Sequence, residues 1–525
     1  MPENSNSPHP SRRNFLALGG GAGLALALAA CSSGGGSSSS GGSNSVSGVS
    51  TVLLPGTQPI GWGNVIAKAN AKLQKDLGFT LDAQFVSWTN YVSQNLLKFT
   101  AGGSFDTTDE ALWMNMAQLQ QQGALAQIPT FSKYPNLAAT IPSTLVTANQ
   151  WSGKLWGVPQ VNTAGRLVHF VIRQDLADKW GISSIGDYGD LERFLYTAKQ
   201  KGGSMIPFAA NSTLTFEMAV PNPNALFNEA SWNDPHTIGQ MFNGTNLYFI
   251  FAKNAATTGS INPIPFWEDP GTVQAFKTIR KYYQDGIINA NALNLDTATA
   301  HGEFTAGGAA ATDCQTDGLT SSTFLPGLLK VVPSAQIADV LPLKGGLTGT
   351  KPNQTFQAQN NVVINKNGGD LDRAMALQDW VSIKENHDLL EYGIEGTDWK
   401  PVGDNKYQQL SQYTFPGYAL LWRTSLELRT SVMTESEEQE FSWAQDFGNF
   451  TQDPFSSFIP DSTPVKQQVT AMSNVTTEYA NPLYYGAVDV DSQISKLAAA
   501  ADAAGLSTLQ EEMQKQAAAY LKAAK

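Results

Sequence analysis

The chain has 525 residues, of which 42% are hydrophobic and only 15% are charged, and its formal net charge at pH 7 is −12. This length predicts two or more domains with a substantial core, and an acidic chain without a basic stripe argues against nucleic-acid binding. Two cysteines and five histidines are present. No two histidines are spaced as H-x-x-x-H, so a zinc site has no support, and no cofactor or metal is expected.

The first thirty residues have the composition of an export signal. Arg12 and Arg13 precede an apolar run at residues 15–30, which is shorter than the roughly 20 residues of a membrane-spanning helix. The stretch SRRNFL resembles a twin-arginine signal, and the LAAC sequence that ends at Cys31 resembles a bacterial lipobox. This resemblance implies cleavage after residue 30 and a lipid anchor on Cys31, which would hold the protein at the outer face of the bacterial cytoplasmic membrane. A general secretory signal with an incidental cysteine is the alternative.

Residues 31–50 are rich in Gly and Ser, which predicts a flexible tether. The next elements are a strand at 51–54, a helix at 64–77, a strand at 81–86 and a helix at 91–100. This alternation predicts an α/β fold around a largely parallel sheet. Ligands of such sheets bind beyond the carboxyl ends of the strands, so the loops that follow strands are the places to search for a site.

Several motifs follow in order along the rest of the chain. They are SGKLWGVP at 152–159, VHFVIRQDL at 168–176, KYYQDGIIN at 281–289, FTAGGAA at 304–310 and YGIEG at 392–396. Together they resemble the family 1 extracellular solute-binding proteins of ABC importers, and YGIEG resembles a lipoprotein subfamily of these receptors. One departure is Gly308, which stands where the family usually has lysine.

The resemblance implies a two-lobed α/β fold of the periplasmic-binding-protein type (type II, maltose-binding-protein-like), with hinge crossovers and extra C-terminal helices. The expected first lobe comprises residues 51–159 plus 311–357. The expected second lobe comprises residues 160–310 plus 358–525, with the C-terminal helical extension. The resemblance also implies a monomeric receptor without catalytic residues, which binds a solute between its lobes and presents it to the permease of an ABC importer.

Candidate solute-binding residues lie at strand-to-helix loops, at the expected crossovers, just after the YGIEG motif, and in the stretch at 416–423 that could reach the cleft. Aromatic faces stack on the C–H faces of sugar rings, and polar groups around them bond hydroxyls. The candidates are Trp62, Trp88, Asp109, Glu110, Trp113, Asn162, Gln315, Asp317, Trp399, Trp422 and Arg423. Trp232 and Trp267 are further aromatic residues, and Trp267 is expected to serve packing because it precedes a helix.

The expected solute is a carbohydrate, in particular an oligosaccharide, and two alternatives stay open. A receptor for a peptide or another small polar solute would have the same fold, and a quaternary amine would suit an aromatic cage. A secreted glycoside hydrolase would need two carboxylates about 5–9 Å apart. The neighbouring pair Asp109 and Glu110 does not by itself support that reading, because 45 acidic residues make such pairs common.

Overall fold

The computed structural model describes residues 48–182, 184–211, 238–242, 244–251, 261–341, 346–349 and 351–523. These residues belong to a single compact unit, Val46–Lys525. The predictions for Arg12, Arg13, Cys31 and Trp232 lie outside the described residues, as do the signal and most of the tether. Within the described part of the chain, no helix is long and apolar enough to cross a membrane.

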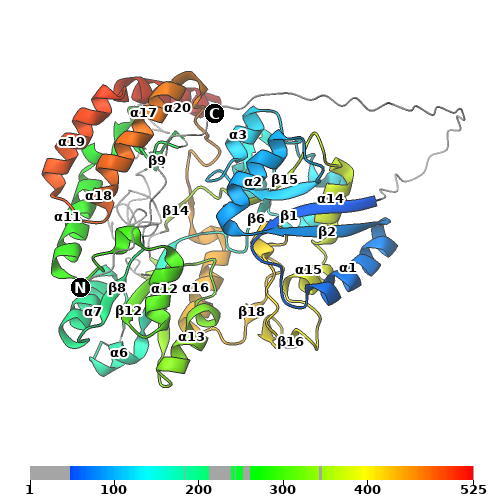
Figure 1. The fold of residues 1–525 in the computed structure, drawn as a ribbon, viewed down its shortest axis with the longest axis horizontal. Helices are drawn as coiled ribbons and strands as arrows, with labels where there is room; N and C mark the ends of the chain where they lie inside the picture. Colours follow the sequence, from blue (N-terminus) through cyan, green and yellow to red (C-terminus); the bar gives the residue numbers. More distant parts are fainter. Residues whose placement is uncertain are drawn as a thin grey trace, which may run out of the picture. The chain divides into compact units, whose positions relative to one another are not determined.

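The first lobe is built on a five-stranded sheet in the order β2-β1-β3-β15-β6 (Figure 1). Its parallel members are β1 (Gly48–Pro55), β2 (Phe79–Val86) and β3 (Thr107–Glu110). Strand β15 (Asn360–Ile364) runs antiparallel to both β3 and β6 (Val158–Gln160). The strands expected at 51–54 and 81–86 are confirmed and are longer than predicted.

Helices cover both faces of this sheet because residues of β1 alternate between two cores. Val52 and Leu54 face a core that contains residues of the helices α1, α14 and α15, whereas Leu53 faces the core on the side of α2 and α3. The bounds of these helices are α1 Trp62–Leu77, α2 Trp88–Thr100, α3 Met116–Gln121, α14 Leu371–Trp380 and α15 Lys384–Glu391. The two helices expected at 64–77 and 91–100 are thus confirmed as α1 and α2.

The second lobe is built on a four-stranded sheet in the order β13-β7-β12-β8. Strand β12 (Ala309–Gln315) is antiparallel to β7 (Val168–Arg173) and parallel to β8 (Ile206–Ala209), and β13 (Ile337–Val340) closes the other edge. Its helices are α6 Gln174–Lys179, α7 Tyr188–Lys201, α11 Pro270–Asp285, α12 Thr297–Thr305, α13 Thr320–Val331 and α16 Glu435–Gln445.

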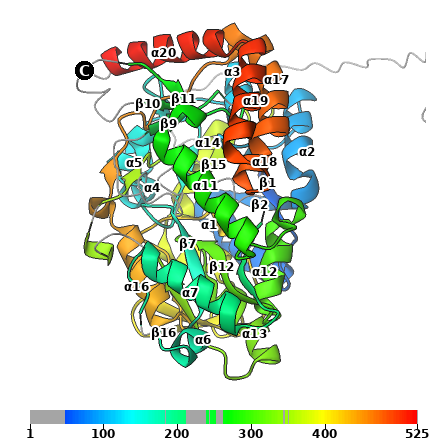
Figure 2. The same ribbon diagram turned by 90° about the vertical axis from the view of Figure 1, so that its left-hand side faces the viewer.

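The C-terminal helices belong to the core of the second lobe. They are α17 Lys466–Val475, α18 Asn481–Tyr484, α19 Val490–Ala503 and α20 Leu506–Ala523. Met472, Leu497 and Leu509 share one apolar cluster with Phe170 of β7 and Ile279 of α11. Figure 2 shows α11 running beside α18 and α19.

The remaining described elements are short. The helices among them are α4 Pro135–Thr140 and α5 Ser143–Ala148. The strands are β4 Gln150–Trp151, β5 Lys154–Leu155, β9 Ile238–Gln240, β10 Phe249–Phe251, β11 Ile264–Pro265, β14 Asn353–Gln354, β16 Trp399–Val402, β17 Lys406–Gln409, β18 Arg429–Thr430 and β19 Thr451–Gln452.

The division of the chain between the lobes differs from the predicted one. Residues 311–357 were expected in the first lobe, but β12 and β13 pair within the second sheet. Residues from 358 onward were expected in the second lobe, but β15 pairs within the first sheet, where Val362 and Ile364 join the core of Val52. The physical reason is pairing on both edges of β12, because Ala311 and Thr312 pair with β7 on one side and with β8 on the other. The chain therefore passes from one sheet to the other after β6, between β13 and β15, and between β18 and α16.

Candidate functional site

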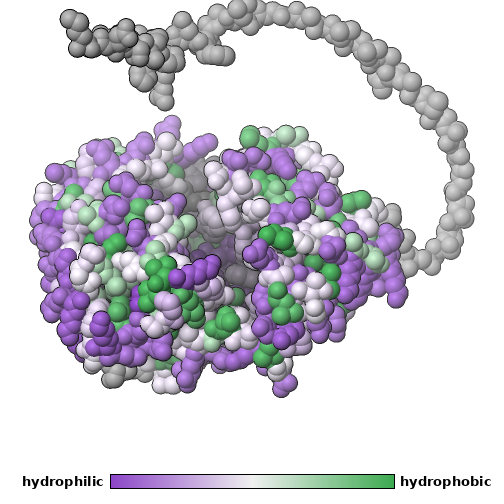
Figure 3. Space-filling model, turned by 60° about the horizontal axis from the view of Figure 1, so that its bottom comes forward, coloured by the Kyte–Doolittle hydropathy of each residue, from purple (hydrophilic) through white to green (hydrophobic). Residues whose placement is uncertain are grey.

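A cavity of about 930 Å³ lies between the two lobes and the crossovers. The first lobe contributes Trp113 and residues of α3, the crossovers contribute residues 161–164 and 354–359, and the second lobe contributes Tyr248 and Phe458. Figure 3 shows the recess between the two halves of the surface. The volume is at the upper end of the roughly 300–1,000 Å³ that small-molecule sites occupy, so it can admit a ligand of several rings.

Four aromatic side chains form a continuous group on the first-lobe side of this cavity, here called the aromatic row. Trp88 stacks on Tyr418 with ring centroids 6.0 Å apart, and Trp113 lies 6.2 Å from Trp88. Trp422 meets Tyr418 edge to face at 5.9 Å. Trp113 and Trp422, the two ends of the row, line the cavity, and Trp88 and Tyr418 connect them.

The local fold holds the two exposed indoles of the aromatic row in place. Trp88 begins α2, and its indole Nε1 donates to the Tyr418 hydroxyl at 3.0 Å. The Trp113 Nε1 donates to the carbonyl of Gln359 at 2.8 Å. Trp88 is nevertheless 42% exposed and Trp113 54% exposed. Exposed indoles whose N–H groups are already bonded are fixed apolar platforms, a surface that suits stacking against a ligand.

Polar groups of the first crossover form the inner wall of the cavity. Asn162 Nδ2 donates to the carbonyl of Asp317 at 3.0 Å, and the Arg166 guanidinium pairs with the Asp317 carboxylate at 3.2 Å. Asp453 also lines the cavity; it is buried, and burial raises the pKa of its carboxyl to about 6. The wall therefore combines one ion pair with amides, a mixture that can bond hydroxyl groups without a strong net charge.

Four predicted site residues line the cavity, namely Trp113, Asn162, Asp317 and Trp422. Trp88 joins them through the aromatic row. The structure places the other six candidates elsewhere.

Trp62 is a core residue and not a loop platform. It is only 5% exposed and stacks on Phe415 with centroids 5.4 Å apart, while Phe85 meets its edge at 5.5 Å. The glycine before it adopts a positive φ of 86° and starts α1, which turns the indole inward. The expected packing role of Trp267 agrees with its 4% exposure.

Asp109 and Glu110 are buried in β3, between β1 and β15, and do not line the cavity. Burial raises the pKa of Glu110 to about 7, although its carboxylate accepts hydrogen bonds from Asn95 Nδ2 at 2.7 Å and from the N–H of Asn115 at 2.9 Å. Burial and the charge of Glu110 raise the pKa of Asp109 well above its ordinary value. Through its bond to the N–H of Asn115, Glu110 supports the start of α3, which carries cavity residues.

Trp399 and Gln315 also lie outside the cavity lining. Trp399 is 6% exposed, packs on Tyr392 and donates its Nε1 hydrogen to the carbonyl of Gly393 at 3.0 Å. The YGIEG motif thus forms a packed turn. Gln315 ends β12, where it pairs with Val168 of β7 and does not line the cavity.

Arg423 is the largest fully buried side chain of the described protein, at 1% exposure. Its guanidinium donates to Gln160 Oε1 and Gln378 Oε1, each at 2.9 Å, and to Ser382 Oγ at 3.2 Å. Burial lowers its pKa to about 9. The residue predicted to bind solute therefore ties the first crossover to α14 from the inside.

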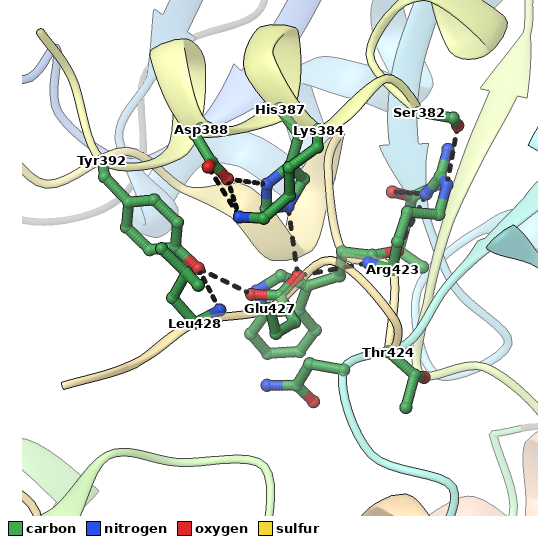
Figure 4. A network of polar contacts seen from close by, with 12 residues as sticks. Ser382, Lys384, His387, Asp388, Tyr392, Arg423, Thr424, Glu427 and Leu428 are labelled. Atoms are coloured by element: carbon green, nitrogen blue, oxygen red, sulfur yellow. Dashed lines mark hydrogen bonds and ion pairs between the residues drawn. The ribbon is translucent and has the colours of Figure 1, made fainter. Parts of the chain in front are cut away.

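Figure 4 shows the polar network around Arg423. Glu427 accepts from the N–H of Arg423 at 3.2 Å, and His387 Nε2 lies 3.4 Å from the same carboxylate. His387 Nδ1 lies 3.0 Å from Asp388. Burial alone would lower the pKa of His387, but the carboxylates of Asp388 and Glu427 outweigh it and raise the pKa to about 9. The network joins α15 to the segment that contains Arg423 and Glu427.

A second buried network fixes α16 in the second lobe. His169 of β7 lies between Asp339 of β13, at 2.9 Å, and Glu440 of α16, at 2.6 Å. Burial opposes the charge on the imidazole, yet the two carboxylates raise its pKa well above the ordinary value. A protonated His169 therefore links β7, β13 and α16, which are far apart in the sequence.

The sequence analysis missed two groups of cavity residues. One group is the glutamines of α3 and of the second crossover, and the other lies in residues 458–470 near the C-terminus. The QLQQQ stretch at 118–122 places three glutamines on one helix face. Among the described residues, no group of His, Cys, Asp and Glu could hold a metal ion.

Comparisons with known proteins agree with this architecture. Residues 454–522 match a family model described as a domain of unknown function (DUF3502). A relative from Streptococcus pneumoniae serotype 4, named carbohydrate ABC transporter substrate-binding protein, is 24% identical over 523 residues, which cover 95% of this chain and 96% of the relative.

Solved structures support the same fold. The N-glycan transport solute-binding protein NgtS of S. pneumoniae superposes with a TM-score of 0.73 at 21% identity, covering 91% of this chain and all of the other. Its complex with Man5GlcNAc gives a TM-score of 0.66 at 21% identity, covering 91% and 99% of the two chains. The predicted resemblance to the extracellular solute-binding proteins of ABC importers is thereby confirmed, and the chain has their two-lobed fold.

Proposed function

We propose that this protein is an extracytoplasmic receptor that captures an oligosaccharide in the interlobe cavity and delivers it to the permease of an ABC importer. The observation that carries the proposal is the aromatic row beside a cavity lined by amides and one ion pair. Sugar rings present C–H faces and hydroxyl edges, so they match indole faces and amide groups together. The names of the relatives, a carbohydrate transporter protein and an N-glycan transport protein, support the same solute class.

The receptor is proposed to bind its solute without changing it. The relatives are named as substrate-binding and solute-binding transport proteins. The acids Asp109 and Glu110 are buried in β3, away from the cavity, which weakens the hydrolase alternative. Recovery of an oligosaccharide intact after incubation with the protein is the expected result, and release of shorter sugars would contradict it.

The anchor at Cys31 belongs to the same proposal. Solute-binding proteins of ABC importers work outside the cytoplasm, and a receptor tethered near its permease can hand over solute without long diffusion. Cys31→Ser is expected to move the protein from the membrane fraction to the soluble fraction. Unchanged membrane association of this variant would show that another segment holds the protein there.

Binding to a panel of immobilised sugars, peptides and quaternary amines tests the solute class. The wild type is expected to bind oligosaccharides, and Trp113→Ala is expected to weaken that binding at least tenfold, about 1.4 kcal/mol, because it removes an exposed stacking platform. Trp88→Ala should weaken binding as well. Leu97→Ala is the matched control, since Leu97 is 65% exposed on the same helix as Trp88 and does not line the cavity.

Each outcome of the panel has a distinct meaning. Binding of a peptide or an amine, and of no sugar, would keep the receptor fold and refute the carbohydrate assignment. Sugar binding that Trp113→Ala leaves unchanged would refute the role of the aromatic row. Small-angle scattering adds a test of lobe closure, because the radius of gyration is expected to fall when a bound ligand draws the lobes together.

A further inference from the structure

Two helix faces from opposite lobes line the outer part of the cavity. On α3 and its C-terminal cap, Gln118, Gln121 and Gln122 are exposed and line the cavity, and their i, i+3, i+4 spacing places them on one face. On α17, Lys466, Val469 and Thr470 line the cavity with the same spacing. We call these sets the α3 face and the α17 face.

The α17 face belongs to the segment that matches the domain of unknown function. Phe458, Ile459 and Pro460 of the same segment also line the cavity. Behind the α17 face, Met472 is fully buried in the second-lobe core together with Leu497 of α19 and Leu509 of α20. The helices after α17 therefore hold a cavity wall in place, in addition to completing the core.

The polar groups of both faces can form further hydrogen bonds. Within the described residues, no side-chain hydrogen bond or ion pair involves the Lys466 ammonium or the three glutamine amides of the α3 face. The Thr470 hydroxyl donates to the carbonyl of Lys466 at 3.1 Å, which leaves its acceptor lone pairs open. Amides, an ammonium and a hydroxyl provide donors and acceptors of the kind that sugar hydroxyls need, and Val469 adds an apolar contact for a ring face.

We propose that the α17 face is an outer subsite for oligosaccharides, which contacts the sugar units beyond those that stack on the aromatic row. This inference rests on the proposed function and deepens it, because it assigns a solute-binding role to the C-terminal segment. A single sugar ring fills only part of a 930 Å³ cavity that extends from Trp422 to Thr470. The subsite therefore selects for chain length: short sugars occupy the aromatic row alone, and longer ones also reach Lys466.

The test is a titration of the purified full chain with a glycan series from one to about nine rings, chosen from the sugars that bind on an array. Lys466→Ala is expected to weaken binding of the longest glycans at least fivefold and to change binding of one- and two-ring sugars less than twofold. Gln121→Ala, on the opposing α3 face, should show the same dependence on length. Lys496→Ala is the matched control, because it removes the same charge from an exposed position on α19 that does not line the cavity.

The outcomes separate this inference from the function on which it rests. If the wild type prefers long glycans and Lys466→Ala abolishes that preference, the subsite is supported. If the wild type binds short and long glycans equally, or if Lys466→Ala equals the wild type at every length while Trp113→Ala still weakens binding, the subsite is refuted and the receptor function stands. If the wild type binds no glycan, the carbohydrate function is refuted and the subsite with it. Equal melting temperatures of the wild type and both lysine variants show that folding is unchanged.

Discussion

Replacing Arg423 with alanine is expected to destabilise the protein by about 3–5 kcal/mol. The substitution leaves three buried acceptors without their donor, namely Gln160 Oε1, Gln378 Oε1 and Ser382 Oγ. A buried polar group that loses its partner costs about 1–3 kcal/mol, and the space left by a fully buried side chain adds to this cost. Removal of one member of a buried charged network costs about 3–5 kcal/mol in other proteins. Such a loss is a large share of the roughly 5–15 kcal/mol by which proteins are stable.

Urea unfolding followed by tryptophan fluorescence and circular dichroism measures this effect. Arg423→Lys keeps a positive charge but lacks the planar fork that reaches three acceptors, so an intermediate loss is expected. Arg193→Ala is the control, because the Arg193 side chain is 58% exposed and pairs with Asp190 at the surface; a change within about 0.5 kcal/mol is expected. If Arg423→Ala also changed the unfolding free energy by less than about 0.5 kcal/mol, the contacts of Arg423 between the first crossover and α14 would not stabilise the protein.

Further predictions concern His387 and two glycines. The pKa of His387 is raised from its ordinary value of 6.5 to about 9 in the folded protein, so its stabilisation is complete below pH 6.5 and is lost as the pH rises through 9. Urea unfolding should therefore show that His387→Gln loses about 3 kcal/mol more unfolding free energy at pH 6 than at pH 10. An equal loss at both pH values would show that His387 is not charged in the folded protein. Gly165→Ala should lower stability by about 1–3 kcal/mol, because an added Cβ would lie 2.0 Å from the ring of Phe450. Gly302→Ala, inside α12 with open space around the added carbon, should instead stabilise the protein by about 0.4–1 kcal/mol in calorimetry.

Local patterns in the sequence predicted the elements and part of the site. Val65, Ala69 and Leu73 repeat at helical spacing, and Gly78 adopts the left-handed conformation that ends α1, as the sequence indicates. Trp113, Asn162 and Asp317 were predicted because they follow strands or lie near expected crossovers, and Trp422 because its stretch could reach the cleft; all four line the cavity.

The missed features depend on partners that are distant in sequence. Nothing near Ala309 reveals whether β12 pairs in the first or the second sheet, because an alanine-rich strand fits either core. Arg423 was predicted to bind solute because the stretch at 416–423 could reach the cleft, but it is buried and its acceptors come from residues 160, 378 and 382. The α17 face was missed for the opposite reason, because Lys466 and Thr470 are ordinary surface residues until the fold places them beside a cavity.

The pairing of β3 with β15 has a consequence for biosynthesis. Thr107 pairs with Ile364, so the first sheet cannot be completed until more than half of the chain has left the ribosome. At about 5–20 residues per second, the intervening segment takes about 10–50 s to synthesise, and during that time β3 has an unpaired edge. The emerging chain therefore exposes an edge on which other strands can pair until Ile364 arrives. The order of synthesis thus gives a chaperone a defined interval in which to bind the nascent first lobe.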